Sequence, residues 1–130
     1  MIQKHCWECG AALIEKPLKG EGIVPFCPVC GEYRFPMYNA AVSMIVVDEN
    51  TGRILLIQQY GRPSYILVAG YINHGESAED AVRREIREET GLHAGRIHFN
   101  RTRFFEPSNT LMSTFTSTPP LVHRFILSFR

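Results

Sequence analysis

The stretch GYINHGESAEDAVRREIREETGL, residues 70–92, contains the strongest structural signal in this 130-residue chain. Its second half predicts an α-helix from Ser77 to Thr90, because Ser77 is a favourable N-cap and Gly91 can end a helix in the left-handed conformation. On a helical wheel the apolar side chains gather on one side, and most of the charged side chains gather on the other. We therefore expect an amphipathic helix whose apolar side faces a core.

Three glutamates of this helix depart from that division. Glu85 and Glu89 fall within the apolar arc, one helical turn apart, and Glu88 lies at its edge. Carboxylates one turn apart repel each other, and a divalent cation offsets such repulsion. Carboxylate oxygens suit hard ions such as Mg²⁺ or Mn²⁺. The wheel alone favours a metal site over the alternative, which is a solvated acidic face.

The spacing of this stretch resembles the Nudix box, which reads Gly, five residues, Glu, seven residues, Arg-Glu, an aliphatic residue, any residue, Glu-Glu, any residue, Gly and an aliphatic residue. The matching positions are Gly70, Glu76, Arg84, Glu85, Ile86, Glu88, Glu89, Gly91 and Leu92. The resemblance implies an α+β chain whose main part is a Nudix-type α/β/α sandwich. It also implies a hydrolase in which water attacks a phosphorus of a nucleoside diphosphate linked to another moiety.

The resemblance further implies roles for single residues. Arg84 would orient the carboxylates by charge-assisted hydrogen bonds, and Glu76 would steady the loop before the helix. The bound cation would neutralise the diphosphate and lower the pKa of the attacking water. Which carboxylate is the general base stays open. The ligands of the catalytic Mg²⁺ or Mn²⁺ would be Glu85, Glu88, Glu89 and the backbone carbonyl of Ala69.

Four cysteines form a second motif. Two C-x2-C pairs lie near the N-terminus, at Cys6, Cys9, Cys27 and Cys30. Four sulfurs fill the tetrahedral shell of a structural zinc ion, and two disulfides are the alternative. The absence of an apolar secretory stretch at the N-terminus favours zinc in a cytoplasmic protein. We expect a zinc ribbon at residues 1–36, stabilised by its metal, and a Nudix domain at residues 37–130.

A four-cysteine ribbon directly before a Nudix domain is similar to the NADH pyrophosphatase (NAD diphosphatase) group. Tyr33-Arg34-Phe35-Pro36 resembles the junction of that group, and Val68-Ala69-Gly70-Tyr71 resembles its entry to the box. Of the motif that follows the box in the group, only Phe105 and Leu111-Met112 are retained. The resemblance implies NAD(H) or a related dinucleotide as substrate, with ADP-ribose or FAD as alternatives and NAD-capped RNA as a variant.

Aromatic and basic side chains are candidates for substrate contacts. Phe35, Tyr71 and Phe105 are the candidate substrate-binding residues. Phe35, Phe105, Tyr60 and Tyr65 could stack on an adenine or nicotinamide ring, although the sequence favours core packing for each of these aromatic residues taken singly. Arg62 and Arg103 are interpreted as surface residues, with phosphate contact as the alternative. The net charge of +1 supports no basic stripe for nucleic acid. A non-catalytic nucleotide sensor or nucleic-acid-binding module is the competing function.

The remaining sequence predicts short strands and an unusual end. Strands are expected at residues 40–47, 53–58, 65–69, 96–99 and 111–115, the second as the hairpin partner of the first. No apolar run reaches the roughly 20 residues of a membrane span. No acidic residue follows Glu106, and the apolar stretch 122–129 does not resemble a covering helix. The sandwich is therefore expected to be short at its C-terminal end, and the apolar tail predicts a homodimer.

Overall fold

The chain forms two units, each with its own core. The computed structural model describes residues 3–120 and divides the chain into Met1–Tyr38 and Asn39–Arg130. Buried Cys6, Leu13 and Cys27 form the core of the first unit, and eleven buried residues form the larger core of the second. Within the described range, the helix is neither long enough nor apolar enough to cross a membrane.

The first unit is a small antiparallel sheet. Its strands are β1 (Ile14–Leu18), β2 (Gly22–Cys27) and β3 (Glu32–Tyr33), in the order β1-β2-β3. A tight turn joins the first two strands, and Gly20 and Gly22 adopt positive φ angles there, a conformation that glycine permits at little cost. Because only three residues of this unit form its buried apolar cluster, packing alone contributes little to its stability.

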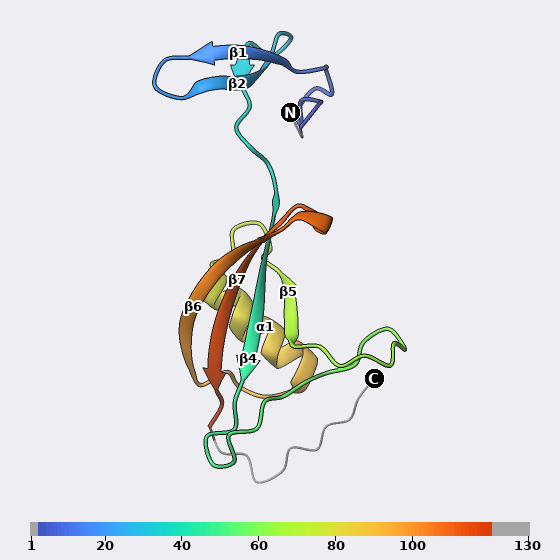
Figure 1. Ribbon diagram of the computed structural model, residues 1–130, viewed down its shortest axis with the longest axis vertical. Coiled ribbons are helices and arrows are strands. Elements are labelled where there is room, and N and C mark those ends of the chain that lie inside the picture. The colour runs from blue at the N-terminus through green and yellow to red at the C-terminus, as the bar shows by residue number, and fades with distance from the viewer. Residues whose placement is uncertain (1–2, 121–130) are drawn as a thin grey trace. The chain divides into compact units, whose positions relative to one another are not determined.

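The second unit is built on a four-stranded sheet of mixed direction (Figure 1). Its strand order is β5 (Val68–Tyr71), β4 (Asn39–Val46), β7 (Thr110–Thr118) and β6 (Arg96–Phe105). The β4–β7 pair is parallel and the other two pairs are antiparallel. The strands expected at residues 40–47, 96–99 and 111–115 are confirmed, and the last two extend further than their sequence patterns indicate.

The helix α1 (Ala78–Thr90) covers one face of this sheet (Figure 1). The Ser77 hydroxyl accepts a hydrogen bond from the Asp80 amide at 3.1 Å, and Gly91 ends the helix at φ 75°. The predicted helix and both of its caps are thus confirmed. Its buried residues are Ala81, Val82, Glu85 and Ile86, and they pack against β4 and β5.

Two expected strands differ from the structure. Residues 53–58 make only isolated bridges, Val47 to Ile54 and Ile57 to Ile66, and the strand expected at 65–69 begins at Val68 and continues to Tyr71. The reason is competition at the end of β4, where the Leu55 amide donates to the Val46 carbonyl at 2.9 Å. This segment occupies the position that a longer β5 would need.

The fold class inferred from the sequence, a mixed α+β chain with a small cysteine-containing ribbon, is confirmed. The expected α/β/α sandwich has a helical layer on each face of its sheet, and within the described residues α1 forms one of these two layers. The opposite face of the sheet carries mostly polar and basic side chains along β7 and β6. The expectations for the apolar stretch 122–129 concern residues outside the described range.

Candidate active site and zinc centre

A cavity of about 530 Å³ lies where α1 meets the free edge of the sheet at β5. Glu85 and Glu89 enter it from the helix, and Ala69 and Tyr71 enter it from β5. Phe105 reaches it from the end of β6, beside the short 3-10 helix Glu106–Ser108. Segments far apart in the sequence therefore surround two carboxylates of the helix.

Gly70 allows the Glu85 carboxylate to lie against β5. A Cβ atom built on Gly70 would lie 2.1 Å from the Cδ atom of Glu85, far inside contact distance. Glu85 is 8% exposed, so its carboxylate has little room to move away. The first residue of the box is thus a glycine because its missing side chain forms the space that this carboxylate occupies.

Arg84 holds the acidic residues together through all five of its N–H donors. Its Nε donates to Glu76 Oε1 at 2.7 Å, and its Nη1 donates to Glu85 Oε1 at 2.7 Å and to Glu88 Oε2 at 3.1 Å. Its Nη2 donates to Glu76 Oε2 at 3.0 Å and to the Tyr71 carbonyl at 2.9 Å. These carboxylates raise the pKa of Arg84, which stays charged. The guanidinium thereby ties the helix to the strand and to the loop between them.

Glu76 connects this network to the loop. The Asn73 amide donates to Glu76 Oε2 at 2.9 Å, and the Glu76 amide donates to the Asn73 carbonyl at 3.0 Å. The hydrogen bonds from Arg84, and then the one from the Asn73 amide, lower the pKa of Glu76. An ionised Glu76 therefore closes the loop onto the helix at neutral pH.

Glu89 has a partner that the sequence pattern does not reveal. The Gln59 side chain, from the loop after residue 58, donates to Glu89 Oε2 at 3.0 Å and lines the same cavity. Gln59 belongs to no motif, so only its place in the fold identifies it. Glu88 is more exposed, accepts a hydrogen bond from Arg84 and does not line the cavity.

The oxygen donors of the cavity fit a hard divalent cation. Glu85 and Glu89 present carboxylates, Ala69 lines the same cavity, and neither a cysteine nor a histidine is among its described lining residues. Mg²⁺ is held in proteins by one or two carboxylates, with water and substrate phosphate completing its shell. Among the described residues, however, only the cysteines bring three or more ligating side chains within 4.8 Å of one another.

The predicted substrate contacts divide between the two units. Tyr71 and Phe105 line the cavity, with exposed fractions of 57% and 43%. Phe35 is exposed and belongs to the first unit, so its contact with substrate stays a prediction. Lining residues that the sequence did not single out include Gln59, Ser108 and Thr110, whereas Met112 belongs to the retained part of the motif after the box.

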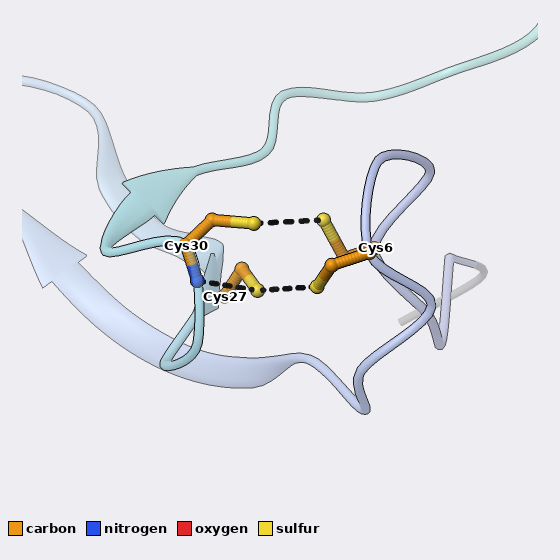
Figure 2. A group of neighbouring side chains, drawn as sticks. Cys6, Cys27 and Cys30 are labelled. Atoms are coloured by element: carbon orange, nitrogen blue, oxygen red, sulfur yellow. Dashed lines mark hydrogen bonds between the residues drawn. The ribbon is translucent and has the colours of Figure 1, made fainter.

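The four cysteines converge as expected for a metal centre (Figure 2). Their sulfur atoms all lie within 4.8 Å of one another, and no disulfide joins them. After each pair, an amide closes a tight turn onto the first cysteine. Gly10 donates to the Cys6 carbonyl at 2.8 Å, and Gly31 donates to the Cys27 carbonyl at 2.9 Å. The four-sulfur set fits tetrahedral zinc.

The electrostatics of the thiols also favour a cation. Backbone hydrogen bonding at Cys9 is the main cause that lowers the pKa of Cys6 to about 6, and the Arg34 guanidinium contributes. Hydrogen bonding with Cys9 and burial raise the pKa of Cys30 to about 12. Crowded thiols therefore do not all ionise together without a positive partner. A zinc ion held by the four sulfurs would supply that partner, because zinc binds the thiolate form.

Arg34 is the protein's own charge beside this centre. Its Nε donates to Cys6 Sγ at 3.3 Å, and its Nη2 donates to Glu8 at 2.6 Å. The guanidinium also lies 4.9 Å from the centre of the Trp7 ring. Arg34 is 8% exposed, which makes it one of the few buried charged residues in the described part of the chain. The Cys6 sulfur therefore accepts a hydrogen bond from the charged Arg34 side chain, in addition to its contacts with the other cysteines.

Comparison with curated proteins places the chain among Nudix hydrolases. "Nudix hydrolase 19, chloroplastic" of Arabidopsis thaliana is 32% identical over 104 residues, which cover 78% of this chain and 24% of that protein. "NAD-capped RNA hydrolase NudC" of Photobacterium profundum is 30% identical over 114 residues, which cover 85% of this chain and 41% of that protein. The chain thus spans less than half the length of either relative.

The solved structures support the same fold. A NUDIX hydrolase from Nitrosomonas europaea has a TM-score of 0.60 at 20% identity, and the match covers 92% of this chain and 69% of that one. At this identity the likeness shows the fold alone. The NUDIX domain family matches residues 37–126, which include the sheet, α1 and the carboxylate cavity. By this match, together with its box and its fold, the chain belongs to the Nudix hydrolase family.

Proposed function

We propose that this chain hydrolyses the diphosphate linkage of NAD(H) or a related dinucleotide and releases two mononucleotides. The observation that carries the proposal is the pair Glu85 and Glu89 at the cavity, with Arg84 and Gly70 holding Glu85 in place. Relatives named as NAD-capped RNA hydrolases support a substrate that contains NAD. An NAD cap on RNA contains the same diphosphate, so it is included in the proposal.

Glu85, Glu89 and the backbone carbonyl of Ala69 would hold the Mg²⁺ or Mn²⁺ ion, and Glu88 would contribute directly or through water. When bound, the cation neutralises the diphosphate and lowers the pKa of the attacking water. Arg84 orients the carboxylates that it contacts, and it contributes through them without contacting the reacting phosphorus.

The proposed reaction consumes one water molecule. The water oxygen forms a bond to one phosphorus, the bond from that phosphorus to the bridging oxygen breaks, and the bridging oxygen leaves with the second phosphate. One proton of the water passes to a carboxylate acting as general base and from there to solvent. NAD would give nicotinamide mononucleotide and AMP, and Tyr71 and Phe105 are placed to stack on a base of the substrate.

A substrate panel tests this proposal. Purified protein is incubated with NAD, NADH, ADP-ribose, FAD and NAD-capped RNA, with Mg²⁺ or Mn²⁺, and the products are identified by mass. Glu89→Gln is expected to lower turnover by about 100-fold or more, because the loss of a charged metal ligand weakens transition-state stabilisation. Glu79→Gln, on the exposed face of the first helical turn, is the matched control. Equal rates for Glu89→Gln and the parent would contradict the proposal.

The same panel separates the alternatives. Turnover of ADP-ribose or FAD in preference to NAD would keep the chemistry and change the substrate. Tight binding of a nucleotide without any product would instead indicate a sensor or a nucleic-acid-binding module. We also expect a homodimer in the cytoplasm, where reducing conditions keep thiols free for zinc. Light scattering coupled to size exclusion tests the dimer, which a monomeric mass would contradict.

A further inference from the structure

A second cavity lies on the face of the sheet opposite α1. Its volume is about 470 Å³, and it shares Met112 with the carboxylate cavity, so the two are neighbours. No carboxylate lines it. Its lining residues are Ser43, Ile45, Leu67, Asn100, Arg101, Arg103, Met112, Thr114 and Thr116.

A β-bulge directs two arginines toward this cavity. The pairing of β6 with β7 shifts between Phe99 and Arg101, so that Arg101 lies opposite Thr114 and Arg103 lies opposite Met112. Both partners line the second cavity. Without the extra residue, the alternation of side chains would place Arg101 on the face covered by α1.

These guanidiniums have no partner among the residues that the structure describes. The arginines that form ion pairs in that part of the chain are Arg34, Arg84 and Arg96. Neither Arg101 nor Arg103 is paired with a carboxylate there, and both are exposed. Two arginines that line a cavity together with hydroxyl groups, and with no carboxylate among the described lining residues, form a surface complementary to a phosphate.

The register of the sheet relates this surface to the carboxylates. One row across the strands runs from Ala69 through Ser43 and Thr114 to Arg101. Three strand spacings separate its ends, so the Cα atoms of Ala69 and Arg101 are about 14 Å apart. A nucleotide whose diphosphate lies at Glu85 and Glu89 can therefore extend toward the arginines across this face, which no helix of residues 3–120 covers.

We propose that Arg101 and Arg103 bind a third phosphate, carried on a ribose of the dinucleotide substrate. This inference rests on the proposed function, because it places the diphosphate at the carboxylate cavity. The shared chemistry is a phosphate on the 2′ or 3′ oxygen of the nucleoside. A 2′-phosphorylated dinucleotide and the first linkage of a capped RNA both present such a group, and the arginine pair selects substrates that carry it.

Calorimetric titration tests the site directly. The probes are 5′-AMP, adenosine 2′,5′-bisphosphate and adenosine 3′,5′-bisphosphate, added to the full chain. We expect at least one bisphosphate to bind about tenfold tighter than AMP, the size of effect that charged hydrogen bonds give. Arg101→Gln/Arg103→Gln should remove this difference and leave AMP affinity within about twofold. Lys19→Gln/Arg53→Gln, which removes two charges outside both cavities, should keep it.

Each result of the titration has a defined meaning. Preference for the 2′,5′ probe identifies a phosphorylated dinucleotide as the source, and preference for the 3′,5′ probe identifies RNA. Equal affinity of the parent for all three probes, or a preference that survives in the double arginine variant, would overturn the inference. Should that variant unfold, as monitored by circular dichroism, the single variants and Arg101→Lys/Arg103→Lys replace it.

A kinetic measurement separates this inference from the proposed function. The double arginine variant should raise KM about tenfold for NADP or for NAD-capped RNA, with kcat and the KM for NAD unchanged. A parent protein that turns over none of these substrates would contradict the proposed function, and the titration would still decide the phosphate site. Turnover of NAD with no change in any KM in the variant would contradict the phosphate site alone.

Discussion

At the scale of single residues, the site depends on contacts that admit little substitution. The guanidinium of Arg84 has no spare donor, and the Glu85 carboxylate occupies the space left by the missing side chain of Gly70. The buried Glu85 carboxylate therefore lies against the backbone of β5 and beside the positive charge of Arg84. A buried carboxylate needs such a charged partner, because it has lost its hydration by water.

Gly70→Ala is expected to destabilise the fold by about 1–3 kcal/mol, the usual cost of overpacking, and to lower turnover strongly. The new methyl group would overlap the Glu85 carboxylate, so the carboxylate must leave its position. Urea denaturation and the substrate panel measure the two effects. The double variant Gly70→Ala/Glu85→Ala should recover most of the lost stability, because the clashing atoms are gone. A double variant no more stable than Gly70→Ala would show that the clash lies elsewhere.

Glu76 makes a prediction about pH. Its pKa is lowered in the fold, chiefly by Arg84, so the ionised carboxylate stabilises the protein above its unfolded pKa of about 4.3. This stabilisation is lost as the pH falls through the lowered value. Arg84→Gln should raise the pKa of Glu76, measured by NMR titration of the side-chain carboxyl. Asp48 is the internal control, because the Thr51 hydroxyl is the first cause of its lowered pKa. An unchanged Glu76 titration would contradict the network.

At the scale of elements, α1 and β6 carry the two candidate sites. The helix presents Glu85 and Glu89 because its caps define where it begins and ends. Strand β6 presents Arg101 and Arg103 because one extra residue shifts its pairing with β7. In both elements the position of a side chain depends on a local backbone feature, a cap or a bulge.

Ser77→Ala is expected to destabilise the second unit by about 1 kcal/mol, because the first turn of α1 loses the acceptor for the Asp80 amide. Glu76 lies next to this cap, so turnover should fall as the start of the helix loosens. Thermal unfolding followed by circular dichroism measures the stability. Ser64→Ala, at an exposed loop position, is the control and should change the melting temperature little. Equal melting temperatures for both variants would exclude a role for the cap.

At the scale of the whole molecule, two cores of different kinds share one chain. The second unit buries a continuous apolar cluster, whereas the first buries two cysteines and one leucine. Hydrophobic burial can stabilise the former, and the latter needs the free energy of metal binding.

Removal of zinc should therefore unfold one unit and spare the other. With a strong chelator, we expect NMR signals of residues 3–38 to lose their dispersion, while signals from the core of residues 39–120 stay in place. Cys9→Ser, which removes one of four ligands, should give the same pattern without chelator and lower the zinc content measured by atomic emission. Retention of dispersed ribbon signals in metal-free protein would contradict a structural role for zinc.

Features that depend on residues close along the chain can be predicted from the sequence alone. The helix with its caps and the side on which Glu85 and Glu89 lie follow from a repeat of 3.6 residues, and the cysteine pairs follow from the geometry of one tight turn. The box likewise indicated Arg84 and Glu76 together, because both lie within one strand–loop–helix unit.

Features that depend on pairing between distant segments become visible only in the folded chain. The hydrogen bond from Gln59 to Glu89 joins residues 30 positions apart in the sequence. Residues 53–58 have the sequence pattern of a strand, but the Leu55 amide makes a single hydrogen bond to β4, at the Val46 carbonyl. The sequence favours a plain surface position for Arg103 over phosphate contact, and Arg103 lies beyond the strand predicted at residues 96–99. The register of paired strands and the position of a bulge depend on how whole strands fit together, so no local sequence pattern predicts them. For this reason the placement of Arg101 and Arg103 at one cavity is visible only in the assembled sheet.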